Sequence, residues 1–147
     1  MLISNEWLKD YVDAGVAIED LAERITRTGI EVDDIIDYTK DIKNLVVGYI
    51  QSKEKHPNAD KLNICQVDIG EEEAVQIVCG APNVEAGQHV IVAKVGGRLP
   101  GDIKIKRAKL RGERSEGMIC SLQEIGISSN VVPKAYENGI FVFTEPI

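Results

Sequence analysis

Six basic side chains gather between positions 104 and 114, and their type and spacing suit the binding of a polyanion. All six are lysine or arginine: Lys104, Lys106, Arg107, Lys109, Arg111 and Arg114. Since Glu113 is the one acidic residue in this basic segment, six positive charges stand against one negative, a net charge of +5. Lysine and arginine donate charge-assisted hydrogen bonds to phosphate oxygens, so the basic segment predicts phosphate recognition.

The rest of the chain is acidic, which sets the basic segment apart. The whole sequence has a net charge of −7, and residues 1–44 hold five basic against eleven acidic side chains. Many charged runs are only solvated loops, and that interpretation stays open here. Apolar residues interleave with the cations and would anchor the segment to the protein: Ile103, Ile105, Ala108 and Leu110. The segregation of charge favours a nucleic acid, another polyanion or an acidic partner.

Aromatic side chains limit the kind of nucleic acid. Proteins that bind single strands without sequence preference stack the bases on several aromatic rings. After position 44 the sequence offers four rings, of which the two phenylalanines are predicted to lie in strand cores: Tyr49, Tyr136, Phe141 and Phe143. Because a stacking surface is poorly supplied, the sequence favours a folded RNA that is recognised by charge and shape.

Residue patterns for catalysis and metal binding are weak. The two histidines, His56 and His89, have no nucleophile or carboxylate at a spacing typical of a triad, and no glycine-rich phosphate-binding motif is present. The three cysteines lie far apart, which argues against a disulfide framework or a zinc ribbon and is typical of a reducing cytosol. The glutamates at 71–73 fit a solvated hairpin tip. We expect no catalytic residue, no metal site, no membrane span and a cytoplasmic location.

The elements that must position the basic segment fall into two regions. The length of 147 residues and an apolar fraction of 44% suit about one domain with a small appendage. Near the start, Ser4 is a good N-cap for a helix, and a second helix is predicted over 18–28 before Gly29. Partial alternation over 30–36 predicts a strand. We assign this N-terminal α/β unit to residues 1–39.

After a short polar junction, the pattern changes at Leu45 to short strands with glycine-rich turns. Strands are predicted at 45–52, 62–67, 75–78, 89–95, 117–121 and 140–143. Five or more short strands in about a hundred residues favour a small β-barrel. The predicted fold class is therefore α+β, with a small helix-containing unit followed by a barrel over residues 40–147.

Six stretches after residue 54 resemble the tRNA-binding OB domain of EMAP-II-like modules and of the C-terminal extensions of some methionyl-tRNA synthetases. In order, they are residues 55–62 (KHPNADKL), 65–70 (CQVDIG), 77–84 (IVCGAPNV), 109–112 (KLRG), 115–121 (SEGMICS) and 124–126 (EIG). The resemblance implies a five-stranded OB-fold β-barrel that binds tRNA.

The first 40 residues are similar to the start of bacterial phenylalanyl-tRNA synthetase β subunits, through residues 1–8 (MLISNEWL) and 21–32 (LAERITRTGIEV). That family implies that the chain is an N-terminal piece of a much longer cytoplasmic subunit. The parent would be an α2β2 ligase that joins phenylalanine to its tRNA with ATP and magnesium, and its partners would be the α subunit and tRNA. Since the family's aminoacylation centre lies in the α subunit, this piece is expected to be non-catalytic and to hold no cofactor.

The resemblance also implies roles for individual residues. The six cations of the basic segment would contact phosphates. His56, Asn58 and Lys61 would shape and edge a ligand-binding loop between the first two strands, and Asn83 and Ser115 would add polar contacts to tRNA. Turn chemistry alone explains the loop residues and Asn83 equally well, and Ser115 could bond only its neighbours.

Two functional hypotheses follow from these features. We expect the chain to bind or position tRNA through the basic segment and the barrel face. The alternative is a structural assembly module of the synthetase with little direct RNA contact, which the acidic bulk and the scarce aromatic rings also fit. The first 40 residues argue against a third hypothesis, a free-standing tRNA-binding dimer.

Overall fold

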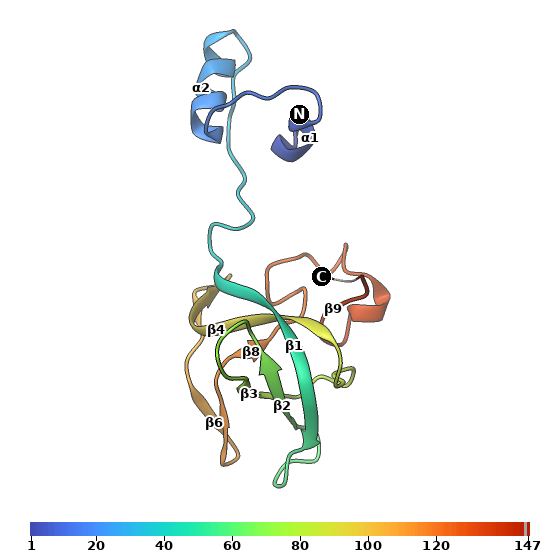
Figure 1. The fold of residues 1–147 in the computed structure, drawn as a ribbon. Helices are drawn as coiled ribbons and strands as arrows, with labels where there is room; N and C mark the ends of the chain where they lie inside the picture. The colour runs from blue at the N-terminus through green and yellow to red at the C-terminus, as the bar shows by residue number, and fades with distance from the viewer. Residues whose placement is uncertain (146) are drawn as a thin grey trace. The chain divides into compact units, whose positions relative to one another are not determined.

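A computed structural model describes residues 1–145 and 147, and the chain divides into two units, Met1–Asp37 and Tyr38–Ile147 (Figure 1). The first unit contains two helices, α1 (Asn5–Lys9) and α2 (Ile18–Arg27). The helix α1 begins behind a capping hydroxyl, whereas α2 has no side-chain cap and relies on acidic residues in its first turn and basic residues in its last.

The predicted strand at 30–36 is wrong, because these residues form neither helix nor strand. A strand needs a neighbouring strand to pair its backbone groups, and no strand among the described residues pairs with this segment. The first unit also lacks a core of its own: among residues 1–37, all of which are described, none is buried.

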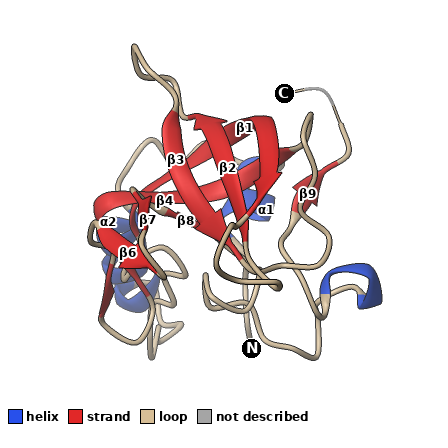
Figure 2. Ribbon diagram, turned by 90° about the horizontal axis from the view of Figure 1, so that it is seen from below, coloured by secondary structure: helices blue, strands red, loops and turns tan. Residues whose placement is uncertain are grey.

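The second unit is built on a curled antiparallel sheet (Figure 2). Its longer strands lie in the order β3–β2–β1–β4 and are β1 (Lys43–Lys55), β2 (Asn63–Asp68), β3 (Val75–Cys79) and β4 (His89–Leu99). Three short strands also pair with β4, namely β5 (Ile103–Lys104), β8 (Met118–Ile119) and β9 (Val142–Phe143). Over the residues that the structure describes, the sheet therefore has seven strands where five are predicted, because short segments extend along β4. Its curvature fits an OB-like fold.

A separate two-stranded sheet carries the second half of the basic segment, with Lys109 and Arg114 in its strands and Arg111 in its turn. It consists of β6 (Ala108–Leu110) and β7 (Glu113–Ser115), and a short 3-10 helix, η1 (Lys134–Tyr136), lies later in the chain. We call β6, β7 and the turn between them the basic hairpin.

Three hydrogen bonds, here called the seam, join the edge strand β3 to the end of the basic hairpin. The Glu116 N–H donates to the Gln76 carbonyl at 2.8 Å, and the Gln76 side-chain amide donates to the Arg114 carbonyl at 2.8 Å. The Val78 N–H donates to the Ser115 hydroxyl oxygen at 3.1 Å. Since these bonds lie outside the strand ladders, the seam attaches the hairpin to the sheet.

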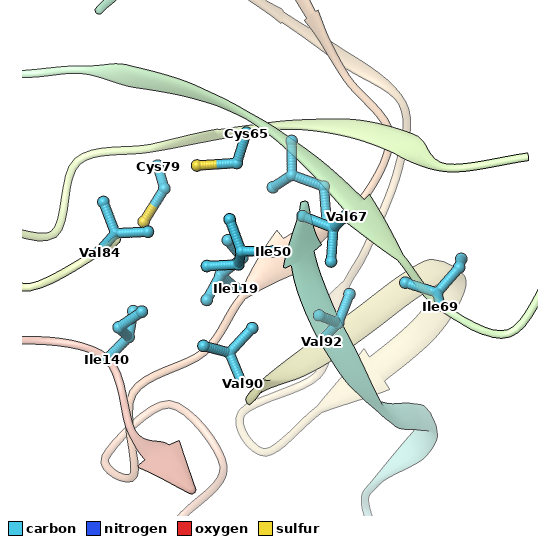
Figure 3. Close-up of a cluster of buried hydrophobic side chains, with 11 residues drawn as sticks. Ile50, Cys65, Val67, Ile69, Cys79, Val84, Val90, Val92, Ile119 and Ile140 are labelled. Carbon is cyan, nitrogen blue, oxygen red and sulfur yellow. The ribbon is translucent and has the colours of Figure 1, made fainter. Parts of the chain in front are cut away.

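The strand β4 is buried on both faces, which explains its continuous apolar run at 90–93. On one face, Val90 and Val92 are 0% exposed and belong to a cluster with residues of β1, β2 and β3, among them Ile50, Cys65 and Cys79 (Figure 3). On the other face, Ile91 and Ala93 pack in a second cluster, with Leu99, Ile105, Cys120 and Leu122. A strand between two apolar layers is a rigid support for the segments attached to it.

Candidate nucleic-acid interface

The basic hairpin turns through two residues with positive φ angles, Arg111 at 51° and Gly112 at 94°. These angles are those of a type I′ turn, whose twist matches that of the paired strands. Glycine adopts such angles freely, whereas a long side chain such as arginine does so rarely. The turn places the Arg111 guanidinium at the tip of the hairpin.

The strand register pairs two cations directly. Lys109 lies opposite Arg114, while Leu110 lies opposite Glu113 and Ala108 opposite Ser115. Like charges at directly opposed positions destabilise a β-ladder. Because side chains alternate between faces and Ser115 is buried toward β3, the opposed Lys109 and Arg114 lie on the face that points away from the core.

All six cations of the basic segment are exposed, but they differ in their partners. The Arg107 guanidinium pairs with the Glu116 carboxylate at 3.2 Å. Within the described part of the chain the other five make no ion pair: Lys104, Lys106, Lys109, Arg111 and Arg114. Five cations are therefore available to an anion without breaking a contact.

The loop between β1 and β2 reaches the basic hairpin through His56. This side chain is 4% exposed, and its Nε2 atom lies 2.8 Å from the Leu110 carbonyl oxygen. Its Nδ1 atom accepts the Asn58 N–H at 3.0 Å, while the His56 backbone N–H donates to the Leu62 carbonyl. Asn58 and Lys61 are exposed on the same loop. His56 therefore faces inward, and the other two predicted loop residues face solvent.

Asn83 and Ser115 are also engaged within the protein. The Asn83 side chain donates to the Ile140 carbonyl at 2.9 Å and accepts the Ile140 N–H at 3.0 Å. An added Cβ at Gly139 would lie 2.2 Å from the Asn83 Oδ1 atom, so the segment passes very close to it. Ser115 is 4% exposed and, besides its seam bond, donates to the Gly117 carbonyl at 3.2 Å. Contact of either residue with tRNA stays a prediction.

A cavity of about 700 Å³ lies beside the basic segment. Its walls come from the ends of β3 and β8, from the segment that holds Lys104 and Lys106, and from residues 121–124 and 137–140. Its volume falls within the usual range of ligand sites. The structure thus brings Lys104, Lys106 and Ser115 to one cavity, and it brings the His56 loop to the hairpin.

The three thiols are buried and poorly suited to chemistry. Burial raises the pKa of Cys65 to about 11 and that of Cys120 to about 12, and the Glu124 carboxylate adds to the rise at Cys120. Burial also raises the pKa of Cys79. Protonated thiols neither attack substrates nor bind metals. The described residues contain no group of three or more His, Cys, Asp or Glu side chains able to hold a metal ion, and none of their helices is long and apolar enough to cross a membrane.

Sequence reasoning missed two features of this surface, the seam and the backbone carbonyl that bonds to His56. Gln76 and Glu116 contribute to the seam, and Leu110 accepts the His56 bond through its backbone carbonyl. Backbone acceptors leave no signal in the residue type. An alternation of glutamine with apolar residues in β3 was the one available signal for Gln76.

Comparisons with known proteins identify related sequences. A family model described as a putative tRNA binding domain matches residues 45–140. Over 143 residues the chain is 94% identical to the phenylalanine–tRNA ligase β subunit of Staphylococcus haemolyticus, covering 97% of this chain and 18% of that protein. It is 82% identical over 145 residues to the corresponding subunit of Staphylococcus aureus, covering 99% of this chain and 18% of that protein. The chain therefore spans 18% of the length of these curated relatives.

Solved structures show weaker similarity. The MetRS related protein from Pyrococcus horikoshii matches with a TM-score of 0.49 and 21% identity, over 80% of this chain and 94% of that one. The C-terminal domain of Plasmodium vivax p43 matches with a TM-score of 0.45 and 28% identity, over 60% of this chain and 48% of that one.

Proposed function

The chain belongs to the family of putative tRNA binding domains, and from this membership we propose that it binds tRNA mainly through the basic hairpin. The observation that carries the proposal is the outward pair of Lys109 and Arg114, two like charges held directly opposite one another. Their repulsion is relieved when a phosphate lies between them. Arg111 at the hairpin tip adds a third cation to the same element.

The binding mode is electrostatic capture with few base contacts. If the five unpaired cations each neutralise a phosphate, the logarithm of the affinity falls against the logarithm of salt with a slope of roughly −3.5 on single strands and −4.5 on duplex. Arg107 contributes less, because its guanidinium already pairs with Glu116. The loop residues Asn58 and Lys61 face solvent and supply further polar contacts.

We assign the three inward polar residues to shaping this surface. His56 bonds the hairpin, Ser115 bonds β3, and Asn83 holds the segment around Ile140. We further propose that the curled sheet is an OB-fold barrel with additional short strands, that it spans residues 40–147, and that residues 1–39 form a separate N-terminal unit.

We propose that the whole protein is the β subunit of a cytoplasmic phenylalanine–tRNA ligase. The 94% and 82% identities to ligase β subunits support this proposal. ATP, magnesium and an α subunit in an α2β2 assembly would then belong to the complete enzyme. The residues of this chain supply tRNA contacts only, and no catalytic step is assigned to them.

An assembly role is the second candidate function. The inward bonding of His56, Asn83 and Ser115 favours it, because these residues stabilise the fold and leave fewer polar groups for RNA. The exposed apolar side chains of residues 1–37, among them Leu2, Trp7 and Tyr11, favour it too, since large exposed apolar groups commonly mark protein contacts.

A tRNA titration separates the two functions. The full chain would be compared with Lys109→Glu/Arg114→Glu and with a matched control, Lys40→Glu/Lys134→Glu, which makes the same change in charge at exposed positions outside the basic segment. We expect the hairpin variant to lose at least about thirtyfold in affinity at low salt, and the control to lose only a few-fold. Equal losses in both variants, or no binding by the unaltered chain, would leave assembly as the function.

A further inference from the structure

One buried side chain connects the two loops of the proposed tRNA surface. His56 lies at the start of the β1–β2 loop, which exposes Asn58 and Lys61, and its ring reaches the Leu110 carbonyl 54 positions later in the chain. Leu110 directly precedes Arg111 at the hairpin tip. Since the ring is 4% exposed, water competes little for this bond.

The hydrogen bonds of the ring fix its tautomer. The Leu110 carbonyl can only accept, so Nε2 must carry a proton and donate across 2.8 Å. The Asn58 backbone N–H can only donate, so Nδ1 must be unprotonated and accept across 3.0 Å. The neutral ring with its proton on Nε2 is therefore the form that satisfies both bonds at once.

We propose that His56 is a positioning residue that latches the β1–β2 loop to the basic hairpin and so sets the spacing between the loop cation Lys61 and the tip cation Arg111. This inference rests on the proposed tRNA binding. A rigid spacing matters because two phosphates on one RNA can be neutralised together only by cations held at a matching separation. Without the latch the two loops would move independently, and ordering them on binding would weaken the affinity.

Two substitutions of His56 separate the hydrogen bond of Nδ1 from that of Nε2. The side-chain amide of asparagine reaches about as far as Nδ1, so His56→Asn can still accept the Asn58 N–H but cannot reach Leu110. The amide of glutamine reaches about as far as Nε2, so His56→Gln can still donate to the Leu110 carbonyl. His56→Asn therefore keeps the bond from Asn58 and loses the bond to Leu110, whereas His56→Gln keeps the bond to Leu110.

The test measures the affinity of the full chain and of both variants for a phenylalanine tRNA transcript. We expect His56→Asn to bind about tenfold more weakly and His56→Gln to bind within about threefold of the unaltered chain. Thermal unfolding of each variant identifies losses that arise from misfolding. A nitrogen-15 NMR spectrum of the unaltered chain should show the Nε2-protonated tautomer, with a coupling across the hydrogen bond to Leu110.

Three results would overturn the latch. If the folded His56→Asn variant bound tRNA as tightly as the unaltered chain, the latch would be excluded and the proposed tRNA binding would stand. An equal loss in both folded variants would assign the effect to direct contact of the ring with the RNA. An Nδ1-protonated ring would contradict the geometry itself. If the unaltered chain bound no tRNA, the proposed function would fail and the latch would have no binding role.

Discussion

The outer face of the basic hairpin and the seam beneath it use polar residues in opposite ways. On the outer face, Lys109 and Arg114 lie opposite one another and are exposed, an arrangement that costs stability. At the seam, Ser115 is buried and both of its hydrogen-bonding roles are filled. Neighbouring positions of one strand thus have separate proposed roles, Arg114 in tRNA recognition and Ser115 in stability. Changes on the outer face should alter binding, and changes beneath it should alter folding.

The largest change in stability concerns the core that supports both surfaces, where two buried thiols should destabilise the fold at high pH. Burial raises the pKa of Cys65 from an ordinary value near 9 to about 11 and that of Cys120 to about 12. The folded chain therefore binds these protons more tightly than the unfolded chain, and stability falls as the pH rises from 9 toward 12. Denaturation by urea at stepwise pH would measure the fall. In Cys65→Ala/Cys120→Ala the slope in this window should be shallower, and an unchanged slope would contradict the assignment.

Asn83→Ala should destabilise the second unit by about 2–3 kcal/mol, because two hydrogen bonds to Ile140 are lost and both backbone groups lose their partner. Thermal unfolding measures this change. In the folded variant the affinity for tRNA should stay the same, because both Asn83 bonds are made within the protein. A clear loss of affinity in the folded variant would instead indicate that Asn83 touches the RNA.

Arg111→Asn should move stability and binding in opposite directions. Asparagine before glycine suits the positive φ angles of the type I′ turn better than arginine, so the variant should gain about 0.5 kcal/mol. Its tRNA affinity should fall by about five- to tenfold, because one phosphate contact is removed. Unfolding and binding titrations on the same sample measure whether the free energy of unfolding rises and whether the tRNA affinity falls. A loss of stability together with unchanged affinity would contradict a functional role for the tip.

Arg107→Gln should have the smallest effect. Since its guanidinium already pairs with Glu116, we expect tRNA affinity to change by no more than about twofold. A matched change, Lys109→Gln, should cost more than this in the same titration. If Arg107→Gln proved the more damaging of the two, the ion pair would have to open on binding.

The strands with strong alternation could be predicted from the sequence, and the basic hairpin could not. The predicted strand at 75–78 is confirmed as Val75–Cys79, and the one at 62–67 as Asn63–Asp68, because apolar residues alternate there against a buried face. The hairpin strands have only three residues each and mix charged with apolar side chains, and the turn residues are not a typical type I′ pair, so the strands gave no such signal. Its charge nevertheless marked it as a candidate site.

The hydrogen-bond partners of the polar site residues could not be predicted from the sequence either. Residue type suggested that His56, Asn83 and Ser115 were either ligand contacts or turn residues, and in the structure each bonds to a segment far along the chain. These partners depend on which loops the fold brings together. The strand expected at 30–36 illustrates the same point, since alternation alone does not supply a pairing partner.

In the proposed function, the outward cations of the basic hairpin neutralise tRNA phosphates, and the residues beneath them only shape the fold. The most direct measurement is the salt dependence of tRNA affinity for the full chain and for Lys109→Gln/Arg114→Gln. We predict that the variant's log–log slope is shallower by roughly two, one for each phosphate contact removed. Its melting temperature should not fall, because the repulsion between the two opposed cations is removed. An identical slope in the two proteins would contradict the claim.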